Sequence, residues 1–222
     1  MPALLFGSIS TLADTSELQR ESFNEAFATH GLDWRWERPE YVELIRSSGG
    51  ADRIAEYAKA RGEDVDAAAV HAAKSEIFQR KLADASVSPR PGVLESLRTA
   101  RETGTKVALV TTTSPANVAA LVGALEPQVS LADFDVVVDS TTVETPKPDP
   151  AAYRYALQTL GVDAVDAVAV EDNLGGVQAA VAAGVSVFAF PNANTAGHDF
   201  AAATGVVDHL DPAQLQLAGG AA

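Results

Sequence analysis

Three short segments of the sequence carry polar groups of the kinds that hold an anion or a metal ion. Residues 111–115, Thr-Thr-Thr-Ser-Pro, offer hydroxyls and the free backbone N–H groups of a helix start, which together bind anions. Lys147 offers a positive charge on a loop that prolines stiffen, so it loses less entropy on holding a fixed anion. The adjacent carboxylates of Glu171 and Asp172 could hold a hard cation through oxygen ligands. These residue types indicate an anion site beside a cation site.

Each segment also has a simpler interpretation. Threonines often do no more than end a strand, and Thr113 or Ser114 suits the N-cap of the next helix. Most lysines in turns are solvated, and Asp172 or Asn173 could serve only as a helix cap. A binding role for these segments therefore requires that the fold bring them together.

The elements around these segments favour an α/β fold. Apolar, β-branched runs predict parallel strands that are buried on both faces, at 4–6, 106–110, 134–139, 167–170, 186–190 and 205–209. Helical patterns lie between them at 93–102, 115–123, 150–160 and 175–183. This alternation predicts a doubly wound, Rossmann-like parallel sheet with right-handed crossovers. Ligands bind such sheets at the carboxyl ends of the strands, and all three segments stand there.

The residues after the first strand have a different pattern. Apolar residues recur at three- and four-residue spacing in four stretches, 16–30, 39–46, 50–61 and 65–82, which predicts helices. We therefore expect an α/β core domain made of residues 1–13 and 87–222, with a helical cap domain, 14–86, inserted after the first strand. The tail 218–222 is expected to be frayed.

The order and spacing of these segments resemble the haloacid dehalogenase superfamily of phosphohydrolases and phosphomutases. Lys147-Pro-x-Pro-x-x-Tyr153 matches its third motif, and Glu171-Asp172-Asn173-x-x-Gly matches its fourth closely. The inserted helices resemble the branch that includes phosphoglycolate phosphatase, β-phosphoglucomutase and sugar-bisphosphate phosphatases. The resemblance implies that Thr111 and Thr112 contact a phosphoryl group. It also implies that Lys147 neutralises charge there, and that the acidic pair helps to bind Mg2+.

The first motif of that superfamily, Asp-x-Asp-Gly-Thr-Leu, is altered in this chain. Gly7 stands at the position of the nucleophilic aspartate, and Ile9 stands at that of the acid/base aspartate. Gly7 cannot attack phosphorus and Ile9 cannot move a proton, so aspartyl phosphotransfer is expected to be lost. Binding of Mg2+ is expected to be weakened, because residue 7 would supply one of its carboxylate ligands. Lys147 is expected to pair with Glu171, with Asp172 or with a bound phosphate.

A replacement nucleophile is not expected from the sequence. Strand alternation is expected to turn Ser8 away from the site, and Ser10 has no adjacent base. The four histidines form no recognisable triad or metal spacing: His30, His71, His198 and His209.

Two cap segments, 23–27 and 48–54, resemble those of sugar-bisphosphate phosphatases. Asn24 and Arg53 are therefore expected to face the substrate. Ala51 stands where a lysine would be in that group, so the substrate itself is in question.

Composition limits the function further. A formal net charge of −14 argues against nucleic acid as a partner. No apolar run is long enough for a membrane span, and no secretory signal is recognisable. Cysteine is absent, which excludes disulfides and thiolate sites and suits a cytoplasmic protein.

The leading hypothesis is a haloacid-dehalogenase-like protein without aspartyl phosphotransfer. It keeps an anion pocket for phosphate or a small phosphorylated metabolite and acts by ligand binding or regulation. The first alternative is an active phosphatase or phosphomutase on a small sugar phosphate, with a non-standard nucleophile. The second is a protein-interaction module with a collapsed pocket, in which Lys147 bridges to Glu171 or Asp172.

Overall fold

Six parallel strands form one sheet in the computed structural model, which describes residues 2–47 and 49–217. The strand order is β3-β2-β1-β4-β5-β6. The strands are β1 (Ala3–Phe6), β2 (Lys106–Val110), β3 (Val136–Val138), β4 (Ala167–Glu171), β5 (Ser186–Ala189) and β6 (Gly205–Val206). The predicted doubly wound α/β fold is confirmed. Only β3 and β6 are clearly shorter than predicted, and the expected frayed tail lies outside the described residues.

Alternation along β1 explains how the sheet is covered on both faces. Leu4 and Phe6 point into one apolar cluster, which includes residues of α6 (Val93–Thr103) and α7 (Pro115–Leu125). Ala3 and Leu5 point into a second cluster with α8 (Ala151–Leu160) and α9 (Leu174–Ala182). The strand order reverses at β1, which pairs with β2 on one side and β4 on the other. The carboxyl ends of β1, β2 and β4 therefore meet at a topological switch point, where open α/β sheets bind ligands.

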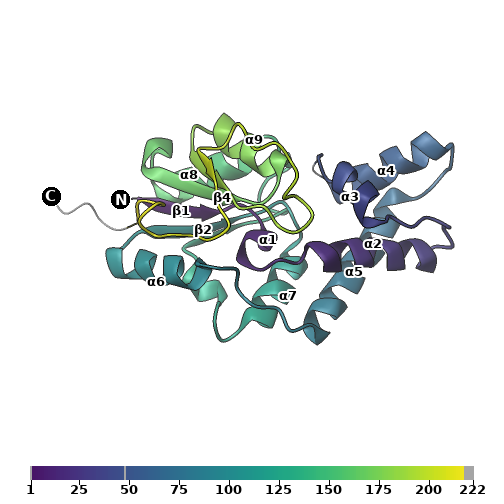
Figure 1. The fold of residues 1–222 in the computed structure, drawn as a ribbon, viewed down its shortest axis with the longest axis horizontal. Helices are drawn as coiled ribbons and strands as arrows, with labels where there is room; N and C mark the ends of the chain where they lie inside the picture. Colours follow the sequence, from purple (N-terminus) through teal and green to yellow (C-terminus); the bar gives the residue numbers. More distant parts are fainter. Residues whose placement is uncertain (1, 48, 218–222) are drawn as a thin grey trace.

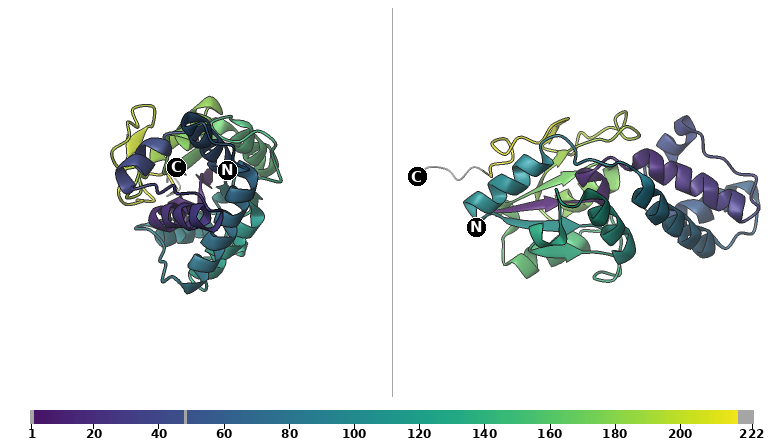
Figure 2. Two further views of the ribbon diagram at one scale, coloured as in Figure 1. Left: turned by 90° about the vertical axis from the view of Figure 1, so that its right-hand side faces the viewer. Right: turned by 90° about the horizontal axis from the view of Figure 1, so that it is seen from below.

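The helices that follow β1 extend from one end of the sheet (Figures 1 and 2). A short helix α1 (Ile9–Leu12) leads into α2 (Ser16–Thr29), α3 (Arg38–Leu44), α4 (Gly50–Arg61) and α5 (Ala67–Asp84). The last four enclose their own apolar cluster, built on aromatic side chains such as Phe23, Phe27 and Trp36. The predicted helices are present, with bounds that differ by at most two residues. The division of the chain into two domains at these bounds stays a prediction.

Polar contacts fasten the inserted helices to the sheet part on two sides. On α5, Gln79 Nε2 donates to Asn117 Oδ1 of α7 at 2.9 Å. On the other side, Arg38 donates to Asn194 Oδ1 at 3.0 Å, and a ring nitrogen of His198 lies 2.9 Å from the Val42 carbonyl oxygen. The space between the two parts is thereby closed on two flanks and lies directly over the strand ends.

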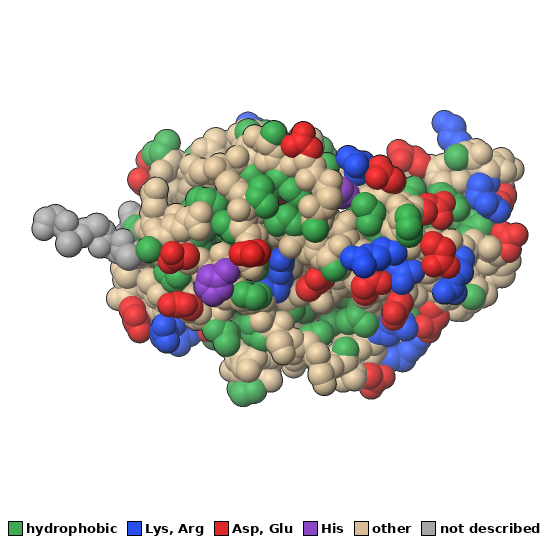
Figure 3. Space-filling model, viewed as in Figure 1, with side chains coloured by type: hydrophobic (Ala, Val, Ile, Leu, Met, Phe, Trp, Pro, Cys, Tyr) green, Lys and Arg blue, Asp and Glu red, His purple; other side chains and the backbone are tan. Residues whose placement is uncertain are grey.

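The face of the molecule seen in Figure 3 carries charges of both signs. Figure 3 shows acidic and basic side chains interspersed over the inserted helices. Within the described ranges, no helix is long and apolar enough to cross a membrane. The cytoplasmic location stays a prediction.

Candidate functional site

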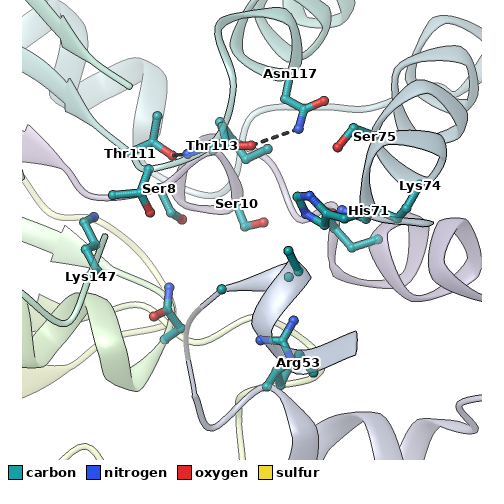
Figure 4. A pocket seen from close by; sticks show the side chains of 18 of the residues that line it. Ser8, Ser10, Arg53, His71, Lys74, Ser75, Thr111, Thr113, Asn117 and Lys147 are labelled. Atoms are coloured by element: carbon teal, nitrogen blue, oxygen red, sulfur yellow. Dashed lines mark hydrogen bonds between the residues drawn. The ribbon is translucent and has the colours of Figure 1, made fainter. Parts of the chain in front are cut away.

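A cavity of about 710 Å³ separates the carboxyl ends of the strands from the inserted helices. Its floor comes from the loops after β1, β2 and β4, and its roof from α2, α4 and α5. In Figure 4, Ser8, Thr111 and Lys147 lie on one side and His71 and Lys74 on the other. The pocket has therefore not collapsed, which disfavours the interaction-module alternative.

Lys147 forms a buried ion pair at the floor of this cavity. Its Nζ lies 2.6 Å from Glu171 Oε1 and also donates to the carbonyl oxygens of Val110, at 2.7 Å, and Gly7. An ammonium group has three N–H donors, so these acceptors use all of them. The expected pairing with Glu171 is confirmed. A bound phosphate could gain a direct hydrogen bond from Lys147 only by displacing one of these partners.

Glu171 is enclosed completely. Its side chain is 0% exposed, and Tyr153 Oη donates to the same Oε1 at 2.7 Å. Burial raises the pKa of Glu171, while the Lys147 charge opposes this rise. Burial and the neighbouring Glu171 carboxylate raise the pKa of Tyr153 well above its usual value. The second oxygen, Oε2, is buried and has no hydrogen-bond partner among the described residues.

Two glycines make the slot that holds this carboxyl group. A Cβ atom added at Gly7 would lie well under 3.0 Å from Glu171 Cδ and Oε1, and from Tyr153 Oη. A Cβ added at Gly176 would meet the same carboxyl group just as closely. Glu171 therefore fills the space in which a side chain at residue 7 would begin. Ile9, at the other altered position, lines the cavity and packs into the apolar core.

Asp172 points a different way and binds Ser8. Ser8 Oγ donates to Asp172 Oδ1 at 2.7 Å, and Ser8 lines the cavity. The expectation that Ser8 turns away is therefore wrong. Strand β1 ends at Phe6 and the chain turns into α1 at Ser8, so strand alternation no longer sets the direction of this side chain.

The carboxylates do not form a magnesium site in this arrangement. Asp172 Oδ1 accepts from Ser8 and Asn173, and its Oδ2 accepts from Asn192 Nδ2 at 2.7 Å. Glu171 is held inside by Lys147 and does not line the cavity. Within residues 2–47 and 49–217, no group of three or more His, Asp or Glu side chains is arranged to hold a metal ion. A hard cation needs several free oxygen ligands, and this donor set does not fit one.

The threonine segment lies at the start of α7, on the cavity wall. Ser114 is the N-cap residue and its Oγ accepts from the Asn117 N–H at 3.3 Å. Thr111 Oγ1 accepts from the Thr113 N–H at 3.2 Å, while Thr112 lines the cavity without a hydrogen bond of this kind. The structure thus brings Thr111 and Thr112 to the cavity beside Lys147, as expected for an anion site at a helix start.

The roof of the cavity carries further basic groups. Arg53 lines it, with Nε donating to the Leu44 carbonyl oxygen at 2.8 Å and Nη2 to that of Ser47 at 2.6 Å. Lys74 is 5% exposed, donates to Gln19 Oε1, and lies over the ring of Phe23. Burial, with help from the Arg53 charge, lowers the pKa of Lys74 to about 7. Burial and the neighbouring Lys74 charge likewise lower the pKa of His71 to about 4.

Lys74 and His71 were not selected from the sequence, although the pattern of α5 contains a signal for Lys74. The buried face of α5 carries Val70, Lys74, Ile77 and Phe78, so a lysine interrupts an apolar stripe at helical spacing. A lysine at such a position either forms hydrogen bonds within the protein interior or points toward a ligand.

Asn24 is not among the residues that line the cavity. Its Nδ2 donates to the Trp36 carbonyl oxygen at 3.1 Å, and its Oδ1 accepts from the Trp36 N–H at 2.8 Å. The side chain thus fixes the loop between α2 and α3 from within the helical part, away from the substrate side that we expected.

The charge of the cavity contrasts with that of the whole chain. The charged side chains among its described lining residues are Arg53, Lys74 and Lys147 against a single carboxylate, that of Asp172. The chain as a whole has a formal net charge of −14. The side chains that line this cavity therefore favour an anion, in contrast to the acidic chain as a whole.

Comparison with known proteins agrees with this geometry. The haloacid dehalogenase-like hydrolase family matches residues 10–190. Protein CbbY of Cereibacter sphaeroides is 39% identical over 209 residues, which are 93% of this chain and 91% of that protein. The crystal structure of CbbY from Rhodobacter sphaeroides in complex with phosphate has a TM-score of 0.87 and 38% identity, and covers 99% of this chain and 96% of that chain. An Asp-to-Asn mutant of that CbbY, in complex with xylulose-(1,5)bisphosphate, also has a TM-score of 0.87, at 36% identity. Sequence motifs, fold and relatives agree, and this chain belongs to the haloacid dehalogenase-like hydrolase family.

Proposed function

We propose that this protein binds a small phosphorylated sugar in the cavity between the strand ends and the inserted helices, without transferring phosphate to an aspartate. The observation that carries the proposal is the gathering of Arg53, Lys74 and Lys147 around one cavity of an acidic chain. The relatives support the ligand class, since the CbbY structures contain phosphate and a sugar bisphosphate.

The two ends of the cavity suit the two ends of a sugar bisphosphate. One phosphate would lie at the start of α7, where Thr111, Thr112 and free backbone N–H groups face it. The other would lie near Lys74 and Arg53, on the inserted helices. A dianion beside Lys74 would restore its proton, because an opposite charge favours the charged form of the amine.

The floor of the site lacks the groups that the aspartyl reaction needs. Gly7 offers no nucleophile, and its neighbour Glu171 is held in a slot behind it by Lys147. Because the carboxylates of Glu171 and Asp172 already have hydrogen-bonding partners, we infer that ligand binding does not require Mg2+.

Calorimetric titration with inorganic phosphate and with xylulose 1,5-bisphosphate, each with Mg2+ and with EDTA, tests the proposal. We expect saturable binding, tighter for the bisphosphate and unchanged by EDTA. Lys74→Met should weaken binding of the bisphosphate about 10-fold or more, since a charge-assisted hydrogen bond contributes about 1.5–3 kcal/mol. The matched control is Lys59→Met, which removes an exposed lysine of α4 that lies outside the cavity. Absence of binding for both probes would overturn the proposal.

A second candidate function is hydrolysis or phosphoryl transfer with a non-standard nucleophile. The comparisons favour it, because the matching family is one of hydrolases. One contact favours it as well: a serine hydroxyl and a carboxylate, those of Ser8 and Asp172, meet at the cavity floor. Release of inorganic phosphate from xylulose 1,5-bisphosphate, lost in Thr112→Val and kept in Lys59→Met, would support this candidate. Release that persists in Thr112→Val would point to a contaminating enzyme.

A further inference from the structure

We infer that Ser8 is a phosphoryl acceptor, whose hydroxyl takes the phosphoryl group of a bound phosphate monoester while Asp172 takes the hydroxyl proton. The inference rests on the proposed binding of phosphate esters and adds a chemical step to it. It assigns to Ser8 a role that Gly7 cannot perform.

The direction of the Ser8 side chain is the first argument. Ser8 is the N-cap residue of α1, yet its side chain makes no capping hydrogen bond to that helix. An N-cap serine ordinarily accepts a backbone N–H through its Oγ. Here Oγ instead donates to Asp172 Oδ1 at 2.7 Å, at the floor of the cavity. The hydroxyl hydrogen is donated to a carboxylate, and the oxygen lone pairs remain available to an electrophile.

The rigidity of Asp172 is the second argument. Asn192 Nδ2 donates to its Oδ2 at 2.7 Å, and Thr195 Oγ1 donates to its backbone carbonyl oxygen at 2.6 Å. Asn192 is fixed in turn, since its Oδ1 accepts the N–H groups of Asn194 and Thr195. A carboxylate held by several partners keeps the acceptor hydroxyl in one orientation, and orientation lowers the barrier of such transfers.

Phosphoryl transfer depends more on the position of the nucleophile than on its strength. Phosphoryl transfer passes through a loose transition state, so catalysis depends mainly on positioning and on electrostatic stabilisation. Protein kinases transfer phosphate to a serine hydroxyl whose proton an aspartate accepts. Ser8 and Asp172 have the same two groups in hydrogen-bond contact.

The step balances without a further reactant. The bond between phosphorus and the ester oxygen of the sugar breaks, and a bond between phosphorus and Ser8 Oγ forms. The Ser8 proton passes to Asp172, which releases it to solvent. The departing sugar oxygen, on the opposite side of phosphorus, takes a proton from solvent. Phosphoserine and the free sugar hydroxyl are the products.

Other hydroxyls near the floor lack this arrangement. A second serine–carboxylate contact, Ser16 Oγ donating to Asp14 Oδ1 at 2.6 Å, lies at the start of α2, in the roof of the cavity. Ser10 Oγ lies 2.9 Å from Thr15 Oγ1 and not beside a carboxylate. Ser114 Oγ serves as the cap of α7. Ser8 is therefore the hydroxyl at which we expect a label.

The test is to incubate the whole protein with xylulose 1,5-bisphosphate or acetyl phosphate, quench it in acid, and measure the intact mass and the modified peptide. We expect the mass of one phosphoryl group on Ser8, resistant to hydroxylamine, which cleaves acyl phosphates but not phosphoserine. Ser8→Ala should lose the label, and Ser86→Ala, at an exposed site, should keep the label. Asp172→Asn should slow labelling by about 100-fold or more, the contribution of a positioned base.

Three results would overturn the inference. The first is a label on another residue, or one that hydroxylamine removes. The second is the absence of any label in wild-type protein that binds inorganic phosphate. The third is the absence of phosphate binding, which would overturn the proposed function and this inference together. The wild-type peptide map decides between them even if Ser8→Ala does not fold.

Discussion

Replacing Gly7 by alanine should destabilise this protein, because the carboxyl group of Glu171 occupies the space that the new methyl group needs. The added Cβ would lie well under 3.0 Å from Glu171 Cδ and from Tyr153 Oη, a separation that real Cβ atoms do not show. Either Glu171 or the backbone at residue 7 must shift. Overpacking of a well-filled interior costs about 1–3 kcal/mol.

The contacts around Glu171 set an upper limit on the stability that the Gly7→Ala variant can lose. Glu171 cannot move freely, since Lys147 and Tyr153 both bind its Oε1. If the methyl group expelled it altogether, Lys147 would be buried without its partner, and breaking a buried pair costs about 3–5 kcal/mol. We therefore expect a loss of about 1–3 kcal/mol in the free energy of unfolding, with the larger figure as the limit.

Urea denaturation of a double-mutant cycle would measure this effect. Glu171→Asp shortens the side chain by one methylene and keeps a carboxylate near Lys147. The double variant Gly7→Ala/Glu171→Asp should be more stable than the sum of the single changes by about 1 kcal/mol, a usual size for touching residues. The control is Gly123→Ala, on the exposed side of α7 with no atom within 4 Å of the added Cβ, which should gain up to about 1 kcal/mol. A Gly7→Ala variant with the midpoint of wild-type protein, or strictly additive changes, would refute the reasoning.

Two further outcomes follow from the same contacts. Burial lowers the pKa of Lys74 to about 7, so between pH 7 and its ordinary value of 10.5 the unfolded chain binds a proton that the folded chain does not, and stability rises with pH. The Lys74→Met variant should therefore have a larger free energy of unfolding than wild-type protein near pH 7, on the order of a few kcal/mol at most. This difference should shrink toward pH 10. Urea midpoints whose difference stays constant with pH would contradict the prediction. The double variant Gly7→Asp/Ile9→Asp should show no turnover of sugar phosphates in the presence of Mg2+, because an aspartate at residue 7 meets Glu171. Turnover by this variant would show that Glu171 leaves its slot easily.

The placement of Thr111, Lys147 and Asp172 around one cavity could be predicted from the sequence. Each of these residues follows an apolar strand, or a loop beside one, and parallel strands bring their carboxyl ends together. The same rule does not tell which way a side chain points once its strand has ended. Ser8 is the example, since the start of α1 decides its direction.

Residues of the inserted helices were harder to predict for a different reason. Helical periodicity gives the buried face of α5, but it does not tell whether Lys74 on that face meets a partner or an open cavity. Asn24 illustrates the opposite case. Its two hydrogen bonds to Trp36 join residues twelve apart across an irregular loop, which periodicity does not describe.

The charges at the floor explain why the inserted helices matter for binding. Glu171 already neutralises Lys147, and the positive charge of Arg90 lies near Asp172, so the strand ends carry little uncompensated positive charge. The backbone N–H groups at the start of α7 supply only partial charges. Most of the charge that balances a phosphate must therefore come from Lys74 and Arg53 on the opposite wall. Because both residues belong to the inserted helices, affinity for an anion should depend on how closely these helices approach the sheet, more than on any group at the floor.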